Sequence, residues 1–95
     1  MGSGLITAGR TNINQDDVMF LTYDSLFPEE LYTGKYATCD GISYSILDTI
    51  KLRQFVETGG QLFMKIYAQE KSGVNYYLHT FNTKRQIKKY MDRIV

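Results

Sequence analysis

Cysteine, proline, tryptophan and long apolar runs are almost absent from this sequence. Its single cysteine, Cys39, excludes an internal disulfide and predicts a reducing, cytoplasmic setting. The longest apolar run covers only residues 18–21, far short of a membrane span, so we expect no membrane partner. Residues 1–4 lack a basic segment followed by an apolar core, and we interpret them as an expression scar rather than a secretory signal.

Residues that bind metals or act in catalysis are equally scarce. His79 is the only histidine, so cysteine and histidine together offer two ligands where a zinc site needs about four, and we expect no metal or other cofactor. Cys39 and His79 could act as a nucleophile and its base only if the fold brought them together. A buried, structural cysteine is the commoner role for a single thiol. The pair Gly59-Gly60 lacks the Lys-Ser/Thr of a phosphate loop. We therefore predict a protein that is not an enzyme, with an enzyme whose site the sequence does not reveal as the remaining alternative.

The sequence does have the composition of an ordinary folded domain. It holds 95 residues, of which 43% are hydrophobic and 22% charged. This length allows one modest core. We predict an N-terminal flexible segment over residues 1–15 and a single domain over residues 16–95.

Charge is divided unevenly between the two halves of the chain. Residues 1–48 hold two basic and seven acidic side chains, a balance of −5, whereas residues 49–95 hold nine basic and three acidic, a balance of +6, which together give the net charge of +1. Such asymmetry suggests a nucleic acid or an acidic protein as partner. The alternative is that the two halves neutralise each other in the folded domain.

The first two thirds of the chain alternate between β-prone and helical patterns. Residues 17–23 predict a strand, and Pro28 followed by two glutamates predicts a short helix over 28–33. Asp40-Gly41, between β-prone segments, is a strong hairpin signal. Asp48 is a typical N-cap, so we expect a helix over 49–58 that ends at the glycine pair.

The last third predicts a second hairpin and a second long helix. Strands are expected over 61–69 and 74–81, joined by a three-residue loop at 71–73. A helix is expected over 83–94, because Ile87, Tyr90, Met91 and Ile94 recur at helical spacing.

These elements predict an α+β fold. We expect a small antiparallel sheet of four to five strands with two β-hairpins and with helices packed mainly on one face. Residues 41–46 resemble residues 73–78, and each segment precedes a capped helix, which suggests a weak ββα–ββα repeat.

One candidate binding surface is the basic face of the last helix. Lys84, Arg85, Lys88 and Lys89 face away from its apolar stripe, and two of their pairs are like charges four residues apart. Each such pair costs about 0.2–0.5 kcal/mol in an isolated helix, so an anionic partner is one reason to keep them. The alternative is a solvated face.

The other candidate is one face of the second hairpin. In the expected register Tyr67 pairs with Tyr77, Lys65 with His79 and Phe63 with Phe81. This face is aromatic with a basic centre, a combination that stacks bases and holds phosphates. The alternative is that another strand or a second subunit covers it.

From these features we expect a small non-enzymatic interaction protein: a regulator, an inhibitor or an accessory subunit of a larger assembly, with a phage or mobile element as one conceivable source. Its expected partner is a protein, and an acidic one suits the basic helix. The alternative function is nucleic-acid binding through the basic helix and the aromatic hairpin face. The sequence leaves the oligomeric state open, a homodimer included.

Overall fold

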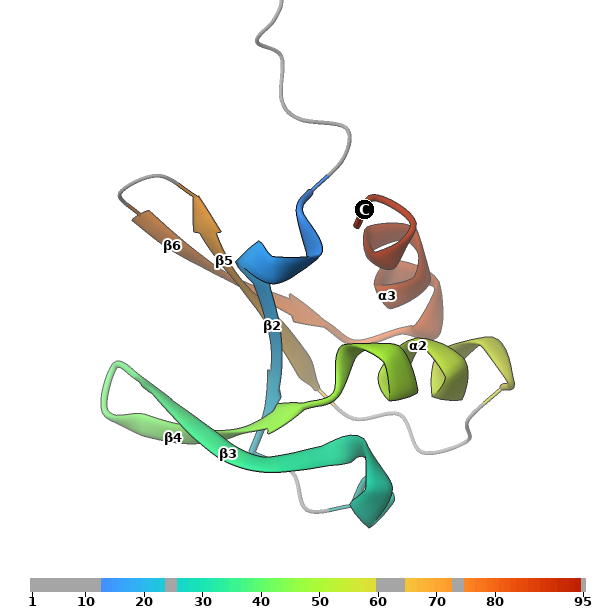
Figure 1. Cartoon of the computed structure of the whole chain (residues 1–95), viewed down its shortest axis with the longest axis horizontal. Helices are drawn as coiled ribbons and strands as arrows, with labels where there is room; N and C mark the ends of the chain where they lie inside the picture. Colours follow the sequence, from blue (N-terminus) through green and yellow to red (C-terminus); the bar gives the residue numbers. More distant parts are fainter. Residues whose placement is uncertain (1–12, 24–25, 60–64, 73–74, 95) are drawn as a thin grey trace, which may run out of the picture.

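The computed structural model describes residues 13–23, 26–59, 65–72 and 75–94, and over these residues the chain forms a five-stranded antiparallel sheet and two α-helices (Figure 1). The strands are β2 (Val18–Thr22), β3 (Tyr32–Cys39), β4 (Ile42–Leu47), β5 (Ile66–Ser72) and β6 (Asn75–Phe81). The helices are α2 (Thr49–Glu57) and α3 (Lys84–Met91), with short 3₁₀ turns η1 (Gln15–Asp17) and η2 (Glu29–Leu31). The strand order β3-β4-β2-β5-β6 confirms the predicted α+β class and both hairpins.

The β3–β4 hairpin forms where the Asp-Gly pair predicted it. Asp40 and Gly41 both have positive φ angles, 52° and 79°, as a two-residue turn between antiparallel strands requires. The turn places Cys39 directly opposite Ile42.

Helix α2 also forms as predicted, because a specific residue caps each of its ends. The Asp48 carboxylate accepts a hydrogen bond from the Lys51 backbone N–H at 3.0 Å, and Gly59 follows the helix with a φ of 81°. Leu52 and Val56 are buried on its inner face, while Ile50 points outward with 61% of its surface exposed.

Helix α3 begins with a capping box. The Thr83 hydroxyl accepts from the Gln86 N–H, and the Gln86 side chain accepts from the Thr83 N–H. The helix ends at Met91, three residues before the predicted end. Beyond it the chain pairs Ile94 with Ile13 in an isolated bridge, and both side chains are buried. The core therefore already includes Ile13, which the sequence had placed in the flexible segment.

The core lies between one face of the sheet and the two helices. Phe20 of β2, Leu47 of β4 and Ile66 of β5 pack there against Leu52 of α2 and Ile87 of α3, and all five are at most 2% exposed. Burial of this apolar area is the main stabilising term of the fold.

The helix predicted over residues 28–33 is wrong. Only a single 3₁₀ turn forms, over Glu29–Leu31, and Gly34 lies inside β3 at an irregularity of the strand instead of ending a helix. The Thr33 hydroxyl donates to the Ile46 carbonyl at 2.8 Å and ties the segment to β4. A helix of one turn gains too few hydrogen bonds to offset its nucleation, so pairing with β4 prevails.

The predicted register of the second hairpin is also wrong. Strand β5 runs to Ser72, which pairs with Asn75, so Tyr67 lies opposite Thr80 instead of Tyr77. A displacement of three residues is odd, and it moves every β6 side chain to the other face relative to β5. The observed register buries Phe81 beside Ile66 and leaves Leu78 exposed. Residues 61–64, where the strand was expected to begin, lie outside the described residues.

Candidate functional site

The sheet has one covered and one open face. In Figure 1 both α-helices lie on one side of β2, and the turn ends of the β3–β4 and β5–β6 hairpins extend on the other. We call the side without a helix among the described elements the open face. Strand alternation and register place these residues on it: Met19, Leu21, Tyr23, Ala37, Cys39, Ile42, Tyr44, Ile46, Tyr67, Gln69, Lys71, Tyr76, Leu78 and Thr80.

Three tyrosines pack together at the centre of the open face. The Tyr44 ring centroid lies 5.1 Å from that of Tyr67 and 5.8 Å from that of Tyr23. Leu21 of the same face is fully buried although it faces away from both helices. Burial raises the pKa of the Tyr44 hydroxyl above its ordinary value of 10.0, and the nearby Cys39, Tyr23 and Asp40 groups raise it further.

Beyond this cluster the open face carries three exposed apolar side chains. Ile42 is 47% exposed, Tyr76 63% and Leu78 39%. With Tyr23 they make up four of the eight large hydrophobic side chains that are exposed within the described parts of the chain. Sequence patterns did not identify Ile42, Tyr76 and Leu78 as surface residues. The alternation of β6 contained the signal, but the register decided which of its two faces lay outward.

The predicted hairpin surface does not form as one surface. Tyr67 belongs to the open face, and Lys65 lies exposed just before β5. Tyr77, His79 and Phe81 lie on the side of the helices. Phe63, the sixth predicted member, lies outside the described residues.

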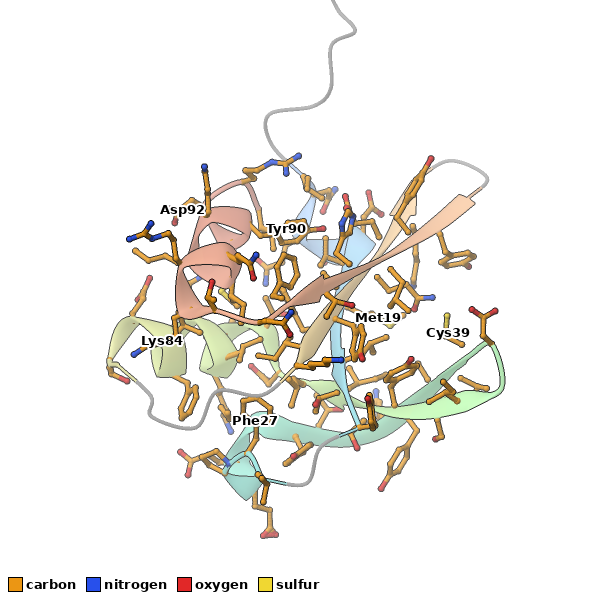
Figure 2. The ribbon with its side chains drawn as sticks, turned by 180° about the vertical axis from the view of Figure 1, so that it is seen from behind. Met19, Phe27, Cys39, Lys84, Tyr90 and Asp92 are labelled. Atoms are coloured by element: carbon orange, nitrogen blue, oxygen red, sulfur yellow. The ribbon has the colours of Figure 1, made fainter. Side chains whose placement is uncertain are left out.

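Two of those predicted residues instead join the basic helix around a hollow of about 400 Å³, which we call the β6–α3 hollow. It is lined by His79, Thr80, Phe81, Gln86, Lys89, Tyr90 and Arg93. Lys89 of the predicted basic helix thus faces the same space as His79 and Phe81 of the predicted hairpin face. Figure 2 shows Tyr90 on the side of α3 toward the sheet.

Aromatic rings and cations form the hollow. The Phe81 and Tyr90 ring centroids are 5.0 Å apart, and the Arg93 guanidinium lies 5.7 Å from the centroid of the Tyr90 ring. The Nε2 atom of His79 lies 2.8 Å from a Glu70 carboxylate oxygen of β5. An aromatic floor with a cationic rim suits a planar or aromatic group that carries negative charge beside it.

The other predicted cations lie outside this hollow. Arg85 and Lys88 are exposed on α3, and Lys84 is half-buried near its start, away from Tyr90 (Figure 2). Because α3 packs on the covered side of the sheet, the basic helix and the open face are on opposite sides. The basic helix therefore shares its side of the sheet with Tyr77, His79 and Phe81 of the predicted hairpin face, but not with Tyr67.

The geometry separates the two residues considered for catalysis. Cys39 is on the open face of β3, whereas His79 is on the covered side of β6, and these strands form opposite edges of the sheet. A nucleophile–base pair between them is excluded. Within the described ranges, no three His, Cys, Asp or Glu side chains gather into a metal-binding group.

No family model, curated protein or solved structure matches this chain. None of the helices in the described part is long and apolar enough to cross a membrane. The two surfaces themselves, the open face and the β6–α3 hollow, are therefore the basis for a functional proposal.

Proposed function

We propose that this protein is a small non-enzymatic binding protein that holds a partner protein against its open face, as a regulator, an inhibitor or an accessory subunit. One observation carries the proposal: half of the exposed large hydrophobic side chains in the described residues lie on this face. Exposed apolar side chains on a sheet face that no described helix covers are typical of an interaction site.

The chemistry of the patch supports a protein partner. Tyrosine is enriched at the centre of protein interfaces because it supplies a large contact area and a polar tip at little entropic cost. The packed cluster of Tyr23, Tyr44 and Tyr67 would be the ordered centre, and Ile42, Tyr76 and Leu78 would supply the surrounding contacts.

Single-stranded nucleic acid is the second candidate for the same face. Lys71 lies among its tyrosines, Lys65 flanks them, and no strand position of the open face is acidic in the described residues. Tyrosines that stack bases beside lysines that contact phosphates are the usual basis of such binding.

Capture from a native lysate, with and without nuclease, tests the proposal. We expect the immobilised protein to retain a partner protein after nuclease treatment. A partner lost with the nuclease would support the nucleic-acid alternative and contradict the proposal.

The alternative has its own measurement, fluorescence anisotropy of a labelled single-stranded oligonucleotide across a salt series. Binding through the open face would be lost on replacing Lys65 and Lys71 with Gln. Binding through the basic helix would instead be lost on replacing Lys84, Arg85, Lys88 and Lys89 with Gln. Salt-insensitive signals in every variant would eliminate a phosphate-binding role.

A further inference from the structure

The two edges of the sheet differ in how they are protected. Edge strands offer unpaired backbone groups to other chains, and proteins usually block them with charges, bulges or irregular geometry. Edge strand β3 has such features: an irregular register between Tyr32 and Tyr36, Gly34 with a φ of 87°, and Lys35. This edge is poorly shaped for an added strand.

Edge strand β6 has none of these features. Its sequence NYYLHTF is rich in β-formers and contains no proline, lysine or acidic residue. Over the described residues β6 pairs only with β5, in an unbroken register from Ile66–Phe81 to Ser72–Asn75. Among the described residues this edge is regular and no further strand covers it.

The β6–α3 hollow lies along this edge. Its lining includes His79 and Phe81, whose side chains point to the covered side, and also Thr80, whose side chain points to the other. Consecutive residues of β6, with side chains on opposite faces of the sheet, line the hollow. The outer edge of the strand therefore forms one wall of the hollow, and α3 forms the other. A strand added to β6 would direct alternate side chains into the hollow.

We propose that the β6 edge and the hollow together bind an extended, acidic segment of a partner protein by strand addition. Backbone hydrogen bonds to β6 would supply affinity, and the hollow would select the side chains. Phe81 and Tyr90 suit an aromatic side chain, while Lys89 and Arg93 suit carboxylates beside it. This groove is distinct from the open face, and its test does not depend on binding there.

Charge favours a heterologous partner over a second copy of this chain. Two copies paired through β6 would bring their α3 helices to the same side of a joined sheet. Each α3 and the turn after it carry five cations and one acid, Asp92. Repulsion between two such helices opposes self-pairing, whereas an acidic segment relieves it.

The direct test is fluorescence anisotropy with two labelled peptides, one containing Glu-Val-Tyr-Val-Glu and one containing Lys-Val-Tyr-Val-Lys. We expect the glutamate peptide to bind more tightly at low salt, by about threefold to tenfold. The variant Lys89→Glu/Arg93→Glu should reverse the preference. The matched control Lys84→Glu/Arg85→Glu, with equal charge change on the same helix but outside the hollow, should keep it.

Two further measurements complete the test. Lys89→Gln/Arg93→Gln, which is milder for the helix, should abolish the preference with an unchanged circular dichroism spectrum. A glutamate peptide with N-methyl groups on alternate backbone amides, along the edge that would face β6, cannot donate those hydrogen bonds and should bind weakly. Equal binding of both peptides, an equal effect of the control variant, no binding at millimolar peptide, or self-association through β6 would each overturn the proposal.

Discussion

Tyr44 illustrates how the open face controls the properties of a single side chain. It lies on a sheet face that no described helix covers, yet Tyr23 and Tyr67 enclose it, and it is buried. Sequence alone identified Tyr44 only as a β-prone residue in a hairpin. Its burial comes from Tyr23 and Tyr67, which follow or belong to other strands, and local patterns do not report such contacts.

The raised pKa of Tyr44 predicts a loss of stability in alkali. Because the folded-state pKa lies above the unfolded value of 10.0, the unfolded chain releases this proton first, and the free energy of unfolding falls as the pH rises above 10. Tyr44→Phe should reduce this fall. Urea denaturation at pH 8 and at stepwise higher pH measures this fall. An identical decrease of the free energy of unfolding with pH in the wild type and in Tyr44→Phe would contradict the role of Tyr44.

Cys39 should be dispensable. It is half-buried at the end of β3, opposite Ile42, and far from the only histidine. We expect Cys39→Ser to keep the fold, with a stability change below about 1 kcal/mol, and to keep partner capture. Loss of capture by a folded Cys39→Ser protein would show that the thiol takes part in function.

At the scale of elements, sequence predicted best where a specific residue begins or ends a structure. Asp48 begins α2, Thr83 begins α3, and the Asp40-Gly41 turn joins β3 to β4, each as expected. The predicted register of the β5–β6 hairpin was wrong because no single residue of the hairpin fixes it. Both faces of β6 are β-prone, so only the tertiary burial of Phe81 could decide between them.

The Thr83 cap gives a quantitative prediction for α3. Thr83→Ala removes the hydroxyl that accepts from the Gln86 N–H at 3.2 Å, and the protein should lose about 0.5–2 kcal/mol of stability. Thr58→Ala is a suitable control, because its exposed hydroxyl only donates to carbonyls at the end of α2, which water can also satisfy. Equal unfolding midpoints for Thr83→Ala and the wild type in urea would contradict the role of the cap.

For the whole molecule, composition and element order were enough to predict the α+β class and helices on one face. The functional surfaces were harder to predict, because each combines residues distant in sequence. The open face joins five strands, and the β6–α3 hollow joins a strand to the helix that follows it. Of the four cations predicted to bind on the last helix, only Lys89 lines that hollow.

Two matched tyrosines test most directly whether the open face binds the partner. Tyr76 and Tyr36 lie on opposite edge strands and are 63% and 69% exposed, but only Tyr76 is on the open face. Affinity for the nuclease-resistant partner is compared between Tyr76→Ser and Tyr36→Ser, both checked for wild-type thermal stability. Tyr76→Ser should weaken binding at least about tenfold, as loss of an interface tyrosine does, and Tyr36→Ser should leave it unchanged. Equal affinities for the two variants would contradict binding at the open face.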